Sequence, residues 1–222
     1  MIKHIHVDEC HSTQDLLKEQ LDSSQGKETF LVSCELQTSG HGRGGKSWTY
    51  QTGSLCFSLN LKPHKVMSFT ALEIAVLIAR FFETKGRSVK LKWPNDIWDN
   101  DHKKASGILV QGKDGHMLAG IGLNLFSNLP DFGGIYPEAF PFNRKEWAQD
   151  ISQFILMNRY EDTDKLKNDW NSRCGHLNQE VRVFEGDEET RGIFQGLGEH
   201  GEATLNTNGK TVSLFNGSLR LT

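Results

Sequence analysis

The pattern of hydrophobic residues changes near residues 174–178, and this change strongly limits how the 222-residue chain can fold. Before this point, helical periodicities alternate with β-branched runs. After it, only short apolar runs occur, separated by glycine, asparagine and acidic turns. The pattern predicts a region of helices and strands up to this boundary, followed by an all-β module of about five strands. The length suits one medium domain and a small second one.

Within the first part, apolar spacing predicts a regular series of elements. We expect strands at 2–7, 30–36, 55–61, 89–93, 106–111 and 117–124, and helices at 15–21, 68–85, 144–157 and 164–172. In the strand at 55–61, apolar and polar residues alternate, which is typical of a half-buried strand. Segment 127–143 contains three of the five prolines and is expected to be a long loop.

Charge and cysteine content exclude several classes of protein. The formal net charge of −3 argues against a protein dedicated to coating nucleic acid. The four cysteines lie far apart, without metal-site spacing, which is typical of reduced thiols in a reducing compartment. The longest apolar stretch, near 71–82, contains Glu73 and Arg80 and is too short to span a bilayer. We therefore expect a soluble, cytoplasmic protein.

Gly40–Gly45 matches the G-x-G-x-x-G pattern, but its context does not fit a dinucleotide site, because no helix follows the loop. A kinase is excluded too: Asp131-Phe132-Gly133 occurs without an H-R-D loop or a V-A-I-K strand. The loop does offer unobstructed backbone N–H groups beside Arg43 and Lys46, an arrangement suited to an anion such as phosphate. A plain flexible loop remains the alternative.

Three further segments carry polar groups at strand ends. Lys92-Trp93-Pro94-Asn95-Asp96 ends a strand with short polar side chains, although the same residues suit a surface turn. Lys103 and Lys104 precede a buried strand in which Gly107 suggests close approach of a ligand or another strand. Gly120–Asn124 is a strand with two glycines that ends in an amide. A solvated charge pair and simple packing are the alternatives for the last two segments.

Together these segments resemble biotin–protein ligases. The matching residues run in the family's order from 12 to 124: Ser12-Thr13, Gln37-Thr38-x-Gly40-x-Gly42-Arg43-x-Gly45 with Trp48, Lys92-Trp93-Pro94-Asn95-Asp96, Lys104-x-x-Gly107-Ile108-Leu109 and Gly120-Ile121-Gly122-Leu123-Asn124. The family usually has arginine at the position of His41 and asparagine at that of Gln14. The resemblance implies an α+β catalytic domain over 1–175, with a mixed, mainly antiparallel sheet and helices on one face, as in class II synthetases, and a second domain over 176–222. A small Src-homology-like β-barrel would end the chain.

The resemblance also implies a two-step reaction. Biotin and ATP would form biotinyl-adenylate and pyrophosphate, and a lysine of a biotin carboxyl carrier protein would then take the biotinyl group and release AMP. The implied catalytic residues are Lys104, Arg43, Lys92 and Asp96, with Asp96 either a Mg²⁺ ligand or the group that orients the incoming lysine. The implied biotin contacts are Ser12, Thr13, Gln14, Gln37, Gly40, His41, Gly42, Arg43, Trp48, Lys104 and Gly107. The implied ATP contacts are Arg43, Lys92, Asn95, Lys104, Asn124 and Phe132, with Tyr136 as a second candidate to stack on adenine.

Two other functions stay open at this point. A lipoate–protein ligase of the same fold is one, and the tryptophan of K-W-P-N-D together with the C-terminal β-module argues against it. A non-catalytic module that binds nucleic acid or protein is the other, and the acidic charge balance argues against it. Only eleven residues precede Ser12, so we expect no DNA-binding domain and no repressor function. The oligomeric state is expected to be a monomer or a weak homodimer.

Overall fold

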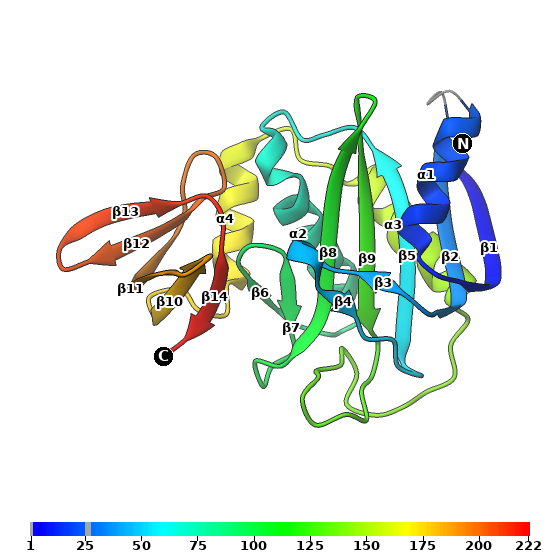
Figure 1. Cartoon of the computed structure of the whole chain (residues 1–222). Coiled ribbons are helices and arrows are strands. Elements are labelled where there is room, and N and C mark those ends of the chain that lie inside the picture. The colour runs from blue at the N-terminus through cyan, green and yellow to red at the C-terminus, as the bar shows by residue number, and fades with distance from the viewer. Residues whose placement is uncertain (1, 25–27) are drawn as a thin grey trace.

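The chain folds around a seven-stranded sheet, which occupies the centre and right of Figure 1. The computed structural model describes residues 2–24 and 28–222. The strands are β1 (Ile2–Cys10), β2 (Thr29–Gln37), β5 (Ser54–Leu61), β6 (Lys90–Lys92), β7 (Asp96–Trp98), β8 (Lys104–Lys113) and β9 (His116–Asn124). Their order is β1-β2-β5-β9-β8-β7-β6; β1 and β2 pair in parallel and the other pairs are antiparallel. The predicted mixed, mainly antiparallel sheet is confirmed.

Helices lie on both faces of this sheet, not on one face as expected. The helices α2 (Thr70–Glu83) and α3 (Arg144–Met157) pack behind it in Figure 1, and α1 (Thr13–Ser24) packs in front. The reason is a short apolar stripe on α1. Leu17 and Leu21 of this helix are buried against Phe30, Val32 and Leu118, and this cluster is separate from the main core.

The position of α1 also explains why β5 is buried on both faces, whereas its alternating sequence predicted a half-buried strand. The polar side of the strand is covered and its groups are paired. Ser58 shares a hydrogen bond of 2.8 Å with Thr13. Asn60 accepts a hydrogen bond from the Phe30 N–H at 2.6 Å. Buried polar groups of this kind are tolerated because each has a partner.

Residues in the left-handed conformation follow α2 and turn the β8–β9 hairpin. Gly86 follows α2 with φ of +72°, the left-handed conformation that terminates helices. Asp114 and Gly115, with φ of 49° and 78°, turn the β8–β9 hairpin. Segment 127–143 contains no helix or strand, as expected. The short strand β7 was not expected, because Lys92–Asp96 was interpreted as the end of a strand, with a surface turn as the alternative.

A second sheet of five strands follows the helix α4 (Thr163–Arg173). Its strands are β10 (Glu180–Glu185), β11 (Glu188–Leu197), β12 (Ala203–Thr207), β13 (Lys210–Leu214) and β14 (Ser218–Leu221), in the order β13-β12-β11-β10-β14. The expected closed barrel is wrong. Among the described residues β13 pairs with β12 alone and β14 with β10 alone, and Figure 1 shows the β12–β13 hairpin projecting away from β14. The domain boundary between 175 and 176 stays a prediction.

The two sheets are joined by specific contacts. The indole Nε1–H of Trp93 donates to the carbonyl of Gly201 at 3.1 Å. The Ser68 hydroxyl donates to the carbonyl of His200 at 2.5 Å. No helix within the described ranges is long and apolar enough to cross a membrane.

Candidate functional site

A pocket of about 330 Å³ opens over β5, β8 and β9, on the face of the large sheet that carries α1. It collects side chains from segments that are far apart in the sequence. The predicted site residues that line it are Ser12, Thr13, Gln14, Gln37, His41, Gly42, Arg43, Trp48, Lys92, Asn95, Asp96, Lys104 and Gly107.

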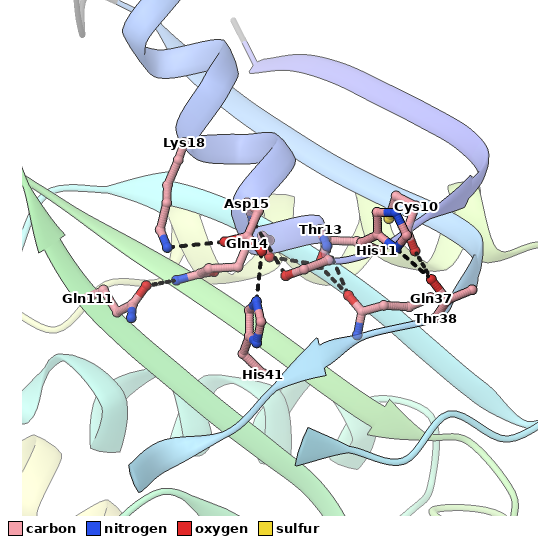
Figure 2. Close-up of polar contacts among 12 residues, drawn as sticks. Cys10, His11, Thr13, Gln14, Asp15, Lys18, Gln37, Thr38, His41 and Gln111 are labelled. Carbon is pink, nitrogen blue, oxygen red and sulfur yellow. Dashed lines mark hydrogen bonds and ion pairs between the residues drawn. The ribbon is translucent and has the colours of Figure 1, made fainter. Parts of the chain in front are cut away.

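Buried polar groups form one end of the pocket, where α1 begins. The Thr13 backbone N–H and hydroxyl both donate to the side-chain oxygen of Gln37, at 2.9 and 3.2 Å (Figure 2). The Gln14 amide nitrogen donates to the Leu118 carbonyl at 3.1 Å. Its Oε1 atom is buried and has no hydrogen-bond partner within residues 2–24 and 28–222. Such an acceptor is suited to an N–H group of a bound molecule.

The segment from Gly40 to Trp48 crosses the pocket as a two-stranded ribbon, β3 (Gly40–His41) and β4 (Ser47–Trp48). Gly44 and Gly45 adopt φ of 63° and 75° at its tip, a conformation that glycine permits at no steric cost. Arg43 donates to the side-chain oxygen of Asn95 at 3.0 Å. The ribbon is therefore fastened to the turn between β6 and β7.

Glycines of β8 and β9 make room for the Trp48 ring. A Cβ atom at Gly122 would lie 2.4 Å from Trp48 Cε2, and one at Gly107 would lie 3.4 Å from Trp48 Cζ3. Only glycine fits at residue 122 without displacing the ring. The groups nearest to Gly107 are two side chains, Lys104 Nζ at 3.2 Å from the Cβ position and then Trp48, and not the ligand or second strand that the sequence suggested. The indole provides the pocket with an apolar wall.

The charged end of the pocket contains four cations, which are Arg43, Lys46, Lys92 and Lys104, and a single carboxylate among the described residues that line it. That carboxylate, Asp96, binds Lys104 Nζ at 2.7 Å through one oxygen and Lys92 Nζ at 3.4 Å through the other. Burial lowers the pKa of the Lys92 ammonium, and Asp96 acts in the opposite direction. The excess of positive charge is suited to a polyanion.

The pocket does not fit a metal ion held by the protein alone. Within the described ranges, no group of three or more His, Cys, Asp or Glu side chains is placed to hold one. Both oxygens of Asp96 already bind lysine ammonium groups. The arrangement therefore favours binding of anions by cationic side chains and backbone N–H groups.

Three predicted site residues do not line the pocket. Gly40 packs against Gln37, and a Cβ atom there would be 2.4 Å from the Gln37 side chain. Asn124 is buried beyond the pocket on β9 and accepts a hydrogen bond from Ser54 at 2.8 Å. Phe132 belongs to the 127–143 segment. One hydrogen bond links this segment to the site, because the Gly133 N–H donates to the Lys104 carbonyl at 2.9 Å. The second candidate for adenine stacking, Tyr136, packs among Phe82, Phe140 and Trp147.

Other pocket residues were not assigned to the site from the sequence. Ser58 lies on β5, and its partner Thr13 is 45 residues away in sequence. Phe184 and Ser218 reach the pocket from the second sheet. Lys46 was noted only as a cation of the glycine-rich loop. No local pattern marks the first three, because Ser58 joins the site through the packing of α1 on β5, and Phe184 and Ser218 join it through the packing of the two sheets.

The fold and the pocket define an α+β protein whose pocket is suited to a partly apolar molecule beside a polyanion. Comparison with known proteins identifies the family. The sequence model described as "Biotin/lipoate A/B protein ligase family" matches residues 7–127, more than half of the chain. The chain belongs to this family.

Individual relatives agree with this assignment. The chain is 27% identical over 199 residues to the biotin–[acetyl-CoA-carboxylase] ligase of Paracoccus denitrificans, covering 78% of this chain and 82% of that protein. It is 32% identical to the bifunctional ligase/repressor BirA of Bacillus subtilis, over 67% of this chain and 46% of that one. The structure of the biotin protein ligase from Aquifex aeolicus in complex with biotin and ATP superposes with a TM-score of 0.78 at 26% identity, covering 99% of both chains.

Proposed function

We propose that this protein is an ATP-dependent biotin–protein ligase. In the first step, a biotin carboxylate oxygen attacks the α-phosphorus of ATP, and pyrophosphate leaves. In the second, a lysine amine of a carrier protein attacks the acyl carbon of biotinyl-adenylate, and AMP leaves. The observation that carries the proposal is the lining of the pocket. It combines a buried polar end, a tryptophan wall and a cluster of cations, which suit the ureido group, the apolar chain and the phosphate of biotinyl-adenylate in turn.

Biotin would lie along the Trp48 wall, with its ureido group at the α1 end. Ser12, Thr13, Gln14 and Gln37 supply polar atoms there, and the unpartnered Gln14 Oε1 is suited to accept a ureido N–H. The biotin carboxylate would then reach Lys104 and the backbone of His41, Gly42 and Arg43. Gly107 keeps this path open beside the indole.

Charge neutralisation is the main catalytic task in the first step, because it brings one anion onto another. Arg43, Lys92 and Lys104 supply the positive charge, and Asn95 binds Arg43 on the phosphate side. Asp96 binds both lysines and would set their positions. Asn124 and Phe132 lie outside the pocket, and contact between them and ATP stays a prediction. We propose that ATP brings Mg²⁺ on its own phosphate oxygens, and no step depends on Asp96 as a metal ligand.

The acceptor would be a biotin carboxyl carrier domain that presents one exposed lysine. We propose a cytoplasmic enzyme without a nucleic-acid or membrane partner, a monomer or weak homodimer that does not repress transcription. The net charge of −3 supports the absence of a nucleic-acid partner.

Calorimetric titration with biotin and then ATP tests the proposal, with lipoate as the parallel ligand because the family also contains lipoate ligases. We expect biotin to bind and lipoate not to bind at the same concentrations. We also expect ATP to release heat only after biotin is present and to yield pyrophosphate. Binding of lipoate in preference to biotin would overturn the proposed substrate.

A further inference from the structure

The ribbon over the pocket is fastened at a second point, away from Asn95. His41 Nε2 lies 2.7 Å from Asp15 Oδ2, and Figure 2 shows the imidazole pointing to the Asp15 carboxylate on α1. The two fastenings lie on opposite sides of the pocket. Arg43 binds the β6–β7 turn, and His41 binds the first turn of α1. The ribbon cannot lift away from the α1 side while the His41–Asp15 contact holds.

Asp15 is well placed to act as a fixed anchor. It stands in the first turn of α1, where a negative side chain is favoured by the helix dipole. Two turns of this helix are fixed to the sheet by Leu17 and Leu21. Lys18 also binds Asp15, at 3.2 Å. Partial burial raises the pKa of Asp15, but the hydrogen bonds and charges of His41 and Lys18 outweigh it and leave the pKa below its ordinary value.

The anchor is adjacent to the polar end of the pocket. Ser12, Thr13 and Gln14 line the pocket immediately before Asp15 in the chain. Movement of His41 away from Asp15 would open the pocket at the end where the biotin head would bind. We propose that Asp15 is a positioning residue that holds the ribbon closed through His41 and so slows escape of the bound adenylate. This inference rests on the proposed ligase function.

The size of the effect follows from exposure. The side chains of His41 and Asp15 are 51% and 44% exposed, so water and salt weaken their attraction. Contacts of this kind change a rate by about two- to fivefold. A histidine partner is also weaker than an arginine, which is always charged and can bind a carboxylate through two N–H groups. Substitutions of His41 can therefore either strengthen or weaken the attraction between residues 15 and 41.

The test measures how fast preformed, radiolabelled biotinyl-adenylate leaves the enzyme, with excess streptavidin to trap the released molecule. Five variants are compared with the wild type: Asp15→Ala, His41→Gln, His41→Arg, Asp15→Ala combined with His41→Gln, and Asp15→Ala combined with His41→Arg. Lys18→Ala is the matched control, because Lys18 binds the same carboxylate but does not line the pocket.

We expect Asp15→Ala and His41→Gln each to speed release by about two- to fivefold, and their combination to be no faster than either alone. His41→Arg should slow release by a similar factor, but only where Asp15 is present. Lys18→Ala should stay within twofold of the wild type. A purely structural role for Asp15 would lower stability without this dependence on residue 41.

The inference would be overturned if the effects of Asp15→Ala and His41→Gln multiply in the double variant. It would also be overturned if His41→Arg slows release when Asp15 is replaced by alanine. These outcomes differ from failure of the proposed function. If the wild type forms no biotinyl-adenylate, the ligase proposal fails. If the wild type forms it and all variants release it at one rate, only the role of Asp15 fails.

Discussion

The ribbon over the pocket and the junction between α4 and the second sheet each contain a histidine, in opposite surroundings. His41 is half exposed and binds a carboxylate. His176 is fully buried beside Trp98, Trp170 and Phe194, at ring-centroid distances of 6.0, 6.1 and 4.3 Å. Neither of its ring nitrogens has a hydrogen-bond partner in the described part of the chain.

The different surroundings of the two histidines mean that the His41 contact costs much less to break than the His176 packing. Breaking the His41–Asp15 pair exposes two groups that water solvates well. Opening the His176 junction exposes several aromatic rings at once, which is far more costly. Substitutions in the two regions should therefore affect different properties: those at the ribbon should change binding, and those at the junction should change stability.

The largest expected effect is a loss of activity at the pocket without a loss of stability. Lys104→Ala removes the cation proposed for the biotin carboxylate, and should lower the rate of adenylation by about 10²–10³. The side chain is 41% exposed, so its removal leaves no cavity and the thermal midpoint should be unchanged. Pyrophosphate exchange measures the rate, and the neighbouring exposed Lys103→Ala is the control. Exchange within tenfold of the wild type would contradict the role of Lys104.

At the junction between α4 and the second sheet, we expect a change of stability that depends on pH. Burial, together with the charges of Lys92 and His102, lowers the pKa of His176 to about 3. The unfolded chain binds this proton below about pH 6.5, whereas the folded protein does not bind it until about pH 3. Acid therefore favours the unfolded state, and this residue should cost up to about 3 kcal/mol of stability at pH 4 relative to pH 7.

His176→Leu removes that proton and should flatten the fall in stability between pH 6.5 and pH 4. Urea unfolding at several pH values measures the difference. The exposed His11→Gln is the control and should leave the slope unchanged. Equal slopes for wild type and His176→Leu would mean that His176 is accessible to protons in the folded protein.

A third substitution tests the contact between the charged end of the pocket and the second sheet. Trp93→Phe removes the indole N–H that donates to Gly201 and leaves a buried carbonyl without that partner. We expect a loss of about 1–2 kcal/mol of stability and a rise in the KM for ATP, because Trp93 lies between Lys92 and Asn95 in the chain. Urea unfolding and steady-state kinetics measure the two effects. Lower stability with an unchanged KM would mean that the second sheet does not influence the charged end.

A smaller effect is expected at the apolar wall. Gly122→Ala places a methyl group within 2.4 Å of the Trp48 ring, which must then shift from its position in the pocket wall. The KM for biotin should rise severalfold, with the KM for ATP almost unchanged. Gly112→Ala on β8 is the control, since its nearest contact would be Met117 Sδ at 3.9 Å. A normal biotin KM in Gly122→Ala would show that the ring position does not control the site.

The sequence predicted the parts of the molecule that depend on local pattern. The helices expected at 68–85 and 144–157 are found at Thr70–Glu83 and Arg144–Met157, because a helical period of apolar residues is a local signal. Local pattern did not predict burial correctly where a segment distant in the sequence covers a strand. β5 is buried on both sides because α1 folds over it, and the alternation of its residues carries no information about that cover.

The candidate site shows the same limit. Arg43, Lys92, Asp96 and Lys104 were found because they belong to compact motifs. The Asp15–His41 contact joins residues 26 apart in the sequence, and its charge pairing has no local signal. Phe184 and Ser218 reach the pocket only through the packing of the second sheet. Such residues can be identified only from the three-dimensional arrangement.

The central claim is that the pocket couples biotin to the α-phosphate of ATP. The direct measurement is mass spectrometry of the small molecules released when purified protein, incubated with biotin and ATP but no carrier, is denatured. We expect biotinyl-5′-AMP and an equal amount of pyrophosphate, and neither product from Lys104→Ala in the same time. Hydrolysis of ATP without a biotinyl adduct, or an adduct with lipoate in place of biotin, would contradict the account.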